Sequence, residues 1–173
     1  MKNNIEIIML GDSITARGEW KELLEIDSIV NLGVDGESTK DILNRLNIVL
    51  EVRPKYVFIM AGINDLNCSI KIEDVFKNYR LIIDSIKDVG ITPIIQATLY
   101  TTMPALNKKV KLLNLMLFAY SDANSLEYID LNPSFIDEDG LLRADLTTDG
   151  LHLGQKAYSA WGYKLKNLKY IFQ

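Results

Sequence analysis

The chain has 173 residues, of which 48% are apolar and 24% charged, and this composition excludes an intrinsically disordered protein. Its formal net charge of −4 and the lack of a Lys/Arg block argue against a nucleic-acid partner. The single cysteine, Cys68, excludes an internal disulfide and a cysteine-based zinc cluster. We expect one domain over residues 1–173.

Short apolar runs alternate along the chain with longer segments of helical period. The run at residues 5–10 is too short for a signal peptide and is interrupted by Glu6, so we expect a strand there and a cytoplasmic protein. No run approaches the ~18 apolar residues of a membrane-spanning helix, so no membrane span is expected. Most runs are almost continuously apolar, which is typical of parallel strands covered on both faces. The predicted strands are residues 5–10, 28–32, 56–61, 91–98 and 127–131.

Apolar residues three and four positions apart predict amphipathic helices between and after these strands. The first helix follows a Ser38-x-x-Asp41 capping pattern, and Trp161 in the last is expected to be a core residue. The helical segments are residues 42–50, 72–86, 106–120 and 158–168. Alternating strands and helices imply right-handed βαβ units. The expected fold class is α/β, a three-layer α/β/α sandwich whose five-stranded parallel sheet has the flavodoxin-like strand order 2-1-3-4-5.

Glycine-rich and polar clusters follow the predicted strands. In chain order they are Gly11-Asp12-Ser13, Gly33-Val34-Asp35-Gly36, Gly62-Ile63-Asn64-Asp65 and, after the fifth strand, Asp149-Gly150-Leu151-His152. In open parallel sheets, ligands bind beyond the carboxyl ends of the strands. Because these clusters should meet at that one edge, the sequence predicts an active site there.

The residue types in these clusters suit nucleophilic catalysis. A serine hydroxyl needs a neighbouring base, and His152, the only histidine, is the one candidate base for Ser13. Asp149, three residues earlier, could hold the ring tautomer and stabilise the imidazolium. The Gly36 N–H and the Asn64 side-chain amide could bind a developing oxyanion. Taken alone, Ser13 is favoured as a helix N-cap, His152 as a packed or surface residue, and the glycines and Asn64 as turn or cap residues, but together they favour a site.

In this order, the four clusters resemble the signature blocks of the SGNH (GDSL-type) hydrolases, and the resemblance covers nearly the whole chain. It implies a serine esterase with Ser13 as nucleophile, His152 as general base and Asp149 supporting the histidine. It also implies an oxyanion hole made by the Ser13 N–H, Gly36 and Asn64. Gly33 is the alternative to Gly36 as the oxyanion-hole glycine if the alignment with the signature block is shifted. The supporting residues, which would shape their loops, are Asp12, Gly33 and Asp65.

Other chemistries lack their motifs in this sequence. It has no Gly-x-Ser-x-Gly pentapeptide of an α/β-hydrolase and no Gly-x4-Gly-Lys-Ser/Thr phosphate loop. The densest acidic stretch, residues 137–140, lacks the alternation of a calcium loop and is interpreted as a solvated turn. Cys68 is expected to be a packed or partly exposed thiol. We therefore expect no metal and no organic cofactor.

The resemblance leaves the substrate open, because a fold and a catalytic set do not determine the acyl group or the alcohol. The chain is short for the family, which favours a shallow cleft and small acyl groups. We expect an acetylesterase acting on a small-molecule ester, with acetylated carbohydrate as a candidate. The alternatives are a lysophospholipase or acyl-thioesterase, and a catalytically silent glycan-binding domain. Tyr100 and Met103, in a predicted cleft wall at residues 99–104, are candidate substrate contacts, although surface packing is the favoured interpretation. The oligomeric state is left open.

Overall fold

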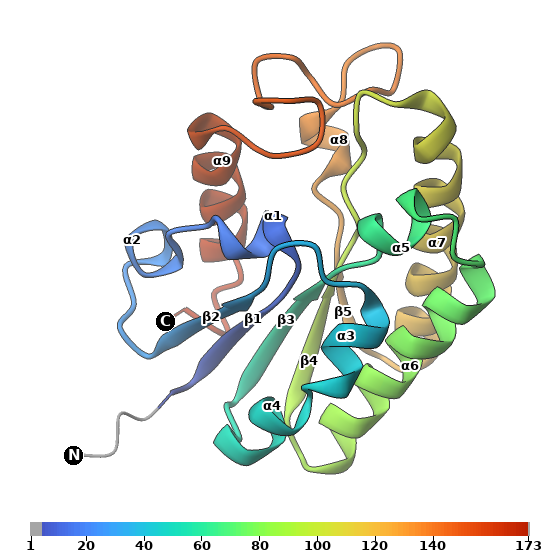
Figure 1. Cartoon of the computed structure of the whole chain (residues 1–173). Coiled ribbons are helices and arrows are strands. Elements are labelled where there is room, and N and C mark those ends of the chain that lie inside the picture. Colours follow the sequence, from blue (N-terminus) through green and yellow to red (C-terminus); the bar gives the residue numbers. More distant parts are fainter. Residues whose placement is uncertain (1–4, 173) are drawn as a thin grey trace.

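A five-stranded sheet runs through the computed structural model, which describes residues 5–172 (Figure 1). Its strands are β1 (Ile7–Gly11), β2 (Ile29–Gly33), β3 (Tyr56–Met60), β4 (Thr92–Gln96) and β5 (Glu127–Ile129). All pairs are parallel, in the order β2-β1-β3-β4-β5. The predicted fold class and strand order are therefore confirmed. The single domain over residues 1–173 stays a prediction, and its ends, residues 1–4 and 173, lie outside the described residues.

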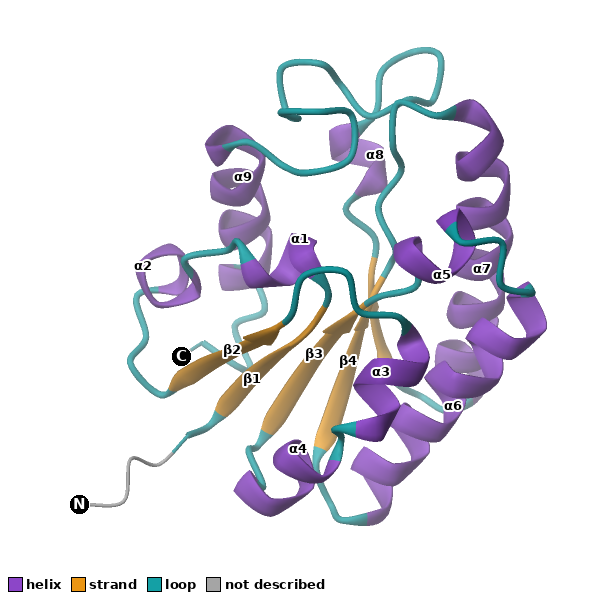
Figure 2. Ribbon diagram, viewed as in Figure 1, coloured by secondary structure: helices purple, strands orange, loops and turns teal. Residues whose placement is uncertain are grey.

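Helices cover both faces of the sheet and complete three layers (Figure 2). On one face, α2 (Trp20–Leu24) packs against α9 (Gln155–Lys166). On the other face, α6 (Ile72–Asp88) packs between α3 (Thr39–Asn44) and α7 (Pro104–Ala123). The shorter helices are α1 (Ser13–Ala16), α4 (Asn47–Val52), α5 (Ile63–Asn67) and α8 (Asn132–Phe135). Within residues 5–172, no helix combines the length and the apolar character needed to cross a bilayer.

Predicted and observed elements differ mainly at their ends. The predicted helix over residues 42–50 is two helices, because Arg45 ends α3 with a φ of −105° and α4 begins after Leu46. The predicted strand over residues 91–98 is shorter, since β4 ends at Gln96 and residues 97–103 continue without regular structure. Four short helices were not predicted, because four or five residues carry too little apolar periodicity to be recognised; they are α1, α2, α5 and α8.

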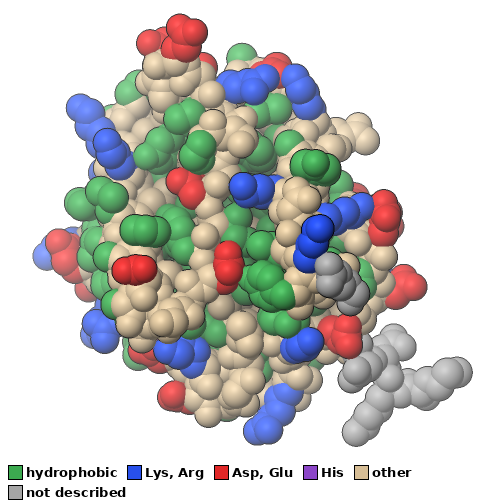
Figure 3. Space-filling view, turned by 180° about the vertical axis from the view of Figure 1, so that it is seen from behind, with side chains coloured by type: hydrophobic (Ala, Val, Ile, Leu, Met, Phe, Trp, Pro, Cys, Tyr) green, Lys and Arg blue, Asp and Glu red, His purple; other side chains and the backbone are tan. Residues whose placement is uncertain are grey.

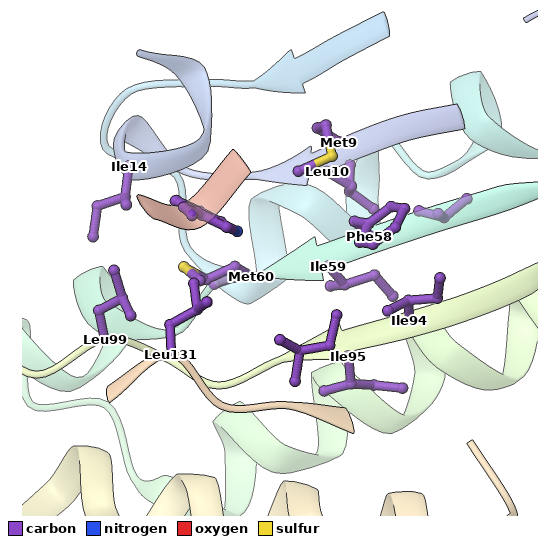
Figure 4. Close-up of a cluster of buried hydrophobic side chains, with 14 of the residues drawn as sticks. Met9, Leu10, Ile14, Phe58, Ile59, Met60, Ile94, Ile95, Leu99 and Leu131 are labelled. Atoms are coloured by element: carbon purple, nitrogen blue, oxygen red, sulfur yellow. The ribbon is translucent and has the colours of Figure 1, made fainter. Parts of the chain in front are cut away.

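The apolar strands form the centre of the core (Figure 4). Most side chains of β1, β3 and β4 are buried because helices cover both faces of the sheet. The central side chains, each at most 1% exposed, are Met9, Leu10, Phe58, Ile59, Ile94 and Ile95. Trp161 of α9 is also fully buried, as predicted, and its ring meets that of Trp20 edge-on with centroids 4.7 Å apart. Burying a large apolar side chain contributes about 1.5–3 kcal/mol, so this contact holds α9 firmly against α2.

The carboxyl ends of the strands lie together at one edge of the sheet. Gly11 at the end of β1 pairs in register with Gly33 of β2 and Met60 of β3. The segments that leave these ends, including α1 and α5, lie at this edge together with the loops before α9 (Figure 1). By contrast, on the described part of the face seen in Figure 3, acidic and basic side chains are interspersed. That face therefore presents no field of a single sign.

Candidate active site

The chain turns from β1 into α1 through Gly11-Asp12-Ser13. A Cβ on Gly11 would lie 2.3 Å from the main-chain oxygen of Met60, so only glycine fits there. Asp12 is the N-cap of α1, because its Oδ1 accepts the N–H of Ile14 at 3.0 Å. The interpretation of Ser13 as the cap is therefore wrong, since the preceding carboxylate fills that position. Ser13 is instead the first helical residue, and its hydroxyl contacts another segment.

That contact joins the two ends of the chain. Ser13 Oγ lies 3.0 Å from His152 Nε2, and His152 Nδ1 lies 2.6 Å from Asp149 Oδ2. Asp149 also accepts the main-chain N–H groups of Leu151 and His152, at 3.0 and 2.7 Å. The bond with the His152 ring, followed by these two, holds the pKa of Asp149 well below its usual range. The ionised carboxylate favours a proton on Nδ1 and leaves Nε2 free to accept one from Ser13.

The segment that carries His152 is itself held from two sides. Thr147 Oγ1 donates to the His152 carbonyl at 2.7 Å and accepts the Gly150 N–H at 2.9 Å. Thr102 donates its main-chain N–H to the Gly150 carbonyl at 2.9 Å. Gly150 has a φ of +88°, and a Cβ there would lie 2.2 Å from Thr102 Oγ1. Residues 99–104, the predicted wall of the cleft, therefore support the histidine loop through Thr102.

Tyr100 lies elsewhere. It lines a separate hollow of about 400 Å³ together with Phe118 of α7 and Tyr128 of β5. The rings of Phe118 and Tyr128 meet edge-on, with centroids 5.5 Å apart. This placement agrees with surface packing, and the interpretation of Tyr100 as a substrate contact has no support in the structure. Met103, which is 41% exposed, lines neither this hollow nor the one described below.

The candidate oxyanion donors come from three segments at the same sheet edge. Gly36 lies in the loop after β2 with a φ of +78°, which suits glycine. Asn64 lies in α5 and donates one amide hydrogen to the Glu37 carbonyl at 2.9 Å. Because the amide carries two hydrogens, the second remains for a ligand. The Ser13 N–H belongs to the first turn of α1, where N–H groups have no acceptor within the helix.

Gly33, the rival of Gly36, has a different role. Its N–H donates to Asn31 Oδ1 at 2.9 Å, so this donor is already engaged. A Cβ on Gly33 would lie 2.2 Å from the main-chain nitrogen of Ala16, which shows how closely α1 approaches β2. The amide of Asn31 strengthens this contact by donating to three carbonyls, those of Thr15, Ala16 and Gly18, at 2.9–3.1 Å. The occupied N–H favours Gly36 over Gly33 as the free donor.

Two buried carboxylates lie behind these groups. Asp65 is 2% exposed and accepts both the N–H and the hydroxyl of Thr39, at 2.9 and 2.7 Å, which joins α5 to the start of α3. Asp12 is 1% exposed, and this burial raises its pKa to about 7, with smaller contributions from the charges of Asp65 and Asp35. Asp12 therefore changes its ionisation near neutral pH.

The sequence interpretation missed the ion pair of Arg45 and Glu37. Arg45 Nε lies 2.9 and 2.7 Å from the two Glu37 carboxylate oxygens. The sequence held a sign of this ion pair, because Arg45 is three residues after Ile42 and four before Val49, on the apolar side of the predicted helix. Both Ile42 and Val49 are fully buried. A charged residue on the apolar side of a predicted helix needs a specific partner.

A hollow of about 520 Å³ adjoins Gly36 and Asn64. Cys68, which is exposed, lines it together with the charged side chains of Lys40 and Lys77. Across residues 5–172, no group of three or more His, Cys, Asp or Glu side chains is arranged to hold a metal ion.

Comparison with known proteins identifies relatives. The model of the GDSL-like Lipase/Acylhydrolase family matches residues 9–160. The N-acylneuraminate cytidylyltransferase of Streptococcus agalactiae serotype V is 27% identical over 152 residues, which are 87% of this chain. The chain spans only 35% of the length of that protein.

Two further relatives are covered over most of their length. Platelet-activating factor acetylhydrolase IB subunit alpha1 of Rattus norvegicus is 28% identical over 167 residues, which cover 89% of this chain and 70% of that protein. The crystal structure of the lipase/acylhydrolase from Enterococcus faecalis superimposes with a TM-score of 0.81 at 26% identity, covering 94% of this chain and 93% of that one. The fold and the order of its elements are thus shared with a solved acylhydrolase.

Proposed function

This chain belongs to the GDSL-like lipase/acylhydrolase family, the SGNH hydrolases, and from that membership we propose that it is a carboxylic ester hydrolase with Ser13 as its nucleophile. The family resemblance seen in the sequence is confirmed by the family match. One observation carries the proposed activity, namely the hydrogen-bonded series from Ser13 through His152 to Asp149, with distances of 3.0 and 2.6 Å. Such a series is the arrangement that activates a serine hydroxyl.

In the first half-reaction, Ser13 Oγ attacks the carbonyl carbon of the ester while its proton passes to His152 Nε2. Asp149 stabilises the imidazolium that forms. The N–H groups of Ser13 and Gly36 and the amide of Asn64 bind the oxyanion, each contributing about 3 kcal/mol to transition-state stabilisation. His152 then returns the proton to the alcohol oxygen, the bond between that oxygen and the acyl carbon breaks, and the acyl group stays on Ser13.

The second half-reaction repeats these steps with water. His152 removes a proton from a water molecule, whose oxygen attacks the acyl carbon, and the same donors bind the second oxyanion. Ser13 leaves with the proton from His152, and the carboxylic acid is released. Every proton transfer uses a group of this chain or water, so the reaction proposed here needs no cofactor.

We propose small acyl groups, acetyl above all, and acetylated carbohydrate as the substrate class. The acetylhydrolase relative supports the acetyl group, and the relative that acts on N-acylneuraminate supports a sugar. The hollow beside Gly36 and Asn64 offers charged groups of both signs to a polar substrate, from Lys40, Lys77, Asp41 and Asp74. A lysophospholipase would instead bring a long apolar chain to this edge.

The test is hydrolysis of p-nitrophenyl esters from acetate to decanoate by the wild type and by Ser13→Ala. Ser159→Ala is the matched control, because Ser159 lies on the exposed side of α9 and its hydroxyl donates to the Gln155 carbonyl of the same helix. We expect turnover to peak at acetate, to survive in the control and to fall by several orders of magnitude without Ser13. Activity that rises with acyl length would indicate the lysophospholipase or thioesterase. Without serine-dependent turnover or fluorophosphonate labelling of Ser13, a silent glycan-binding domain would be indicated.

A further inference from the structure

The guanidinium of Arg45 lies at the junction of three segments. Its Nε and Nη2 contact the Glu37 carboxylate at 2.7–2.9 Å. Nη2 also donates to the carbonyl of Leu32 at 2.7 Å and to that of Gly11 at 3.4 Å. The side chains of Arg45 and Glu37 are only 17% and 16% exposed. A planar guanidinium is suited to such a junction, because its donors point in fixed directions.

These contacts lie next to the nucleophile and to one of the candidate oxyanion donors, Gly36. Gly11 ends β1 directly before Asp12-Ser13, and Leu32 lies at the end of β2. Glu37 follows Gly36 in the loop, and its carbonyl accepts the amide of Asn64 at 2.9 Å. A single side chain, Arg45, therefore connects the turn before the nucleophile, the loop of one donor and, through Glu37, the side chain of another.

The other side chains of this loop are more exposed than Glu37. Val34 donates its N–H to the Gly11 carbonyl at 3.1 Å, but its side chain is 42% exposed. Asp35 pairs with Arg17 at 3.2 Å, and these side chains are 62% and 45% exposed. Exposed ion pairs of this kind contribute little because solvent screens them. Gly36 itself is exposed, and a Cβ added to it would meet nothing within 4 Å. The Glu37 side chain is thus the best-anchored point of the loop.

We propose that Arg45 is a positioning residue that holds the oxyanion hole in its working geometry, acting through Glu37. This inference rests on the proposed function. In the tetrahedral intermediate, the Gly36 N–H and the Asn64 amide must both point at one oxygen atom. The Arg45–Glu37 pair fixes the loop that carries the first donor and the carbonyl that orients the second. Arg45 touches neither substrate nor Ser13 Oγ in this arrangement.

Loss of this pair should act on the transition state more than on substrate binding. A displacement of about 1 Å in a catalytic group can lower the rate about 100-fold. We therefore expect Arg45→Met to lower kcat for p-nitrophenyl acetate about 10- to 100-fold with little change in KM. Arg45→Lys keeps the charge but loses the planar guanidinium with its fixed donors, so its kcat should lie between those of the wild type and Arg45→Met. Added guanidinium ion should restore part of the activity of Arg45→Ala.

Two further readouts separate positioning from general stability. The Ki of a trifluoromethyl ketone, whose hemiketal places an oxyanion in the hole, should rise by the factor by which kcat falls. Amide hydrogen exchange in residues 34–38 should accelerate in Arg45→Met, while exchange in β1 and β3 stays unchanged. Lys166→Met is the matched control, because it removes an ion pair with Glu25 on the far part of α9. It should alter neither readout.

The outcomes are distinct. A folded Arg45→Met variant with wild-type kcat, or with raised KM alone, would overturn the positioning role. If the methionine variant fails to fold, Arg45→Lys and Glu37→Gln provide the same comparison. If the wild type itself shows no turnover dependent on Ser13, the proposed esterase is wrong. The exchange rates of residues 34–38 then still decide whether Arg45 orders the loop, and unchanged rates would refute it.

Discussion

Asp149 binds His152 through two different groups. Its Oδ2 contacts the ring Nδ1 at 2.6 Å, and its Oδ1 accepts the main-chain N–H at 2.7 Å. One carboxylate thus sets both the orientation of the ring and the turn of the chain that carries it. The spacing of three residues makes this possible, because a short turn returns the backbone to the same side chain.

Replacing Asp149 by Asn should therefore impair catalysis while leaving the turn in place. The Asn oxygen can still accept the main-chain N–H, but the amide no longer stabilises the imidazolium and permits the wrong ring tautomer. We expect kcat to fall about 10²- to 10⁴-fold. Asp145→Asn is the matched control, because Asp145 pairs with Lys156 and Arg143 in the same part of the chain. Equal loss in both variants would show that any carboxylate change there disturbs the loop.

Asn64→Ala should lower kcat about 10²- to 10³-fold with KM nearly unchanged, because the amide acts on the oxyanion and not on the ground-state ester. The control is Asn67→Ala, at the exposed end of the same helix, α5. Steady-state kinetics on p-nitrophenyl acetate measure both. A rise in KM at constant kcat would place Asn64 in substrate binding instead.

Gly36 and Gly90 form a matched pair with φ values of +78° and +81°, and a Cβ on either would meet nothing within 4 Å. Alanine at either position should cost about 1–2 kcal/mol of stability, since the left-handed conformation is strained for it. Only Gly36→Ala should also lower kcat/KM, because strain relief rotates the donor N–H. Unfolding curves and kinetics on both variants test this. Full activity in Gly36→Ala would show that the Gly36 N–H is not part of the oxyanion hole.

The buried carboxyl of Asp12 should make the free energy of unfolding depend on pH. In the folded chain its pKa is raised to about 7, whereas in the unfolded chain it is about 4. The folded state holds more protons between these values, so the free energy of unfolding falls as the pH rises from about 4 to about 7. Asp12→Asn keeps an acceptor for Ile14 without the charge. Its Tm should therefore exceed that of the wild type by more at about pH 8 than at about pH 5. An equal difference at both values would contradict the raised pKa.

Cys68 offers a probe of the space next to the oxyanion donors. It is the only cysteine of the chain, is exposed and lines the hollow beside Gly36 and Asn64. A bulky maleimide on Cys68 should lower kcat/KM for acetylated sugars more than for p-nitrophenyl acetate. Cys68→Ala, treated in the same way, should be unaffected. Complete modification with no loss on either ester would place substrate outside the hollow.

Several features could be predicted from local sequence. Near-continuous apolar runs such as residues 56–61 identified the buried parallel strands, because a strand covered on both faces is apolar throughout and these runs are too short for a buried helix. Since parallel strands present their carboxyl ends together, the positions of Ser13, Asn64 and His152 after these runs predicted a common edge. The family match confirms the resemblance that these motifs carry.

Other features depended on which segments meet in space. Asp12, and not Ser13, caps α1. Aspartate and serine have similar preferences for the N-cap position, so only the backbone dihedral angles of the folded chain decide which of the two is the cap. Gly33 donates its N–H to Asn31, which favours Gly36 as the free donor, and this bond follows from the geometry at the end of β2.

The sequence by itself determined the fold class and the residues that reach the active edge, since both follow from the period of apolar residues and the polarity of parallel strands. Only the tertiary structure decided how those residues are held. Arg45 meets Gly11, 34 positions away, and Asp65 meets Thr39, 26 positions away. Such contacts are selected by the packing of α3 and α5 over the sheet, and no local pattern along the chain encodes that packing.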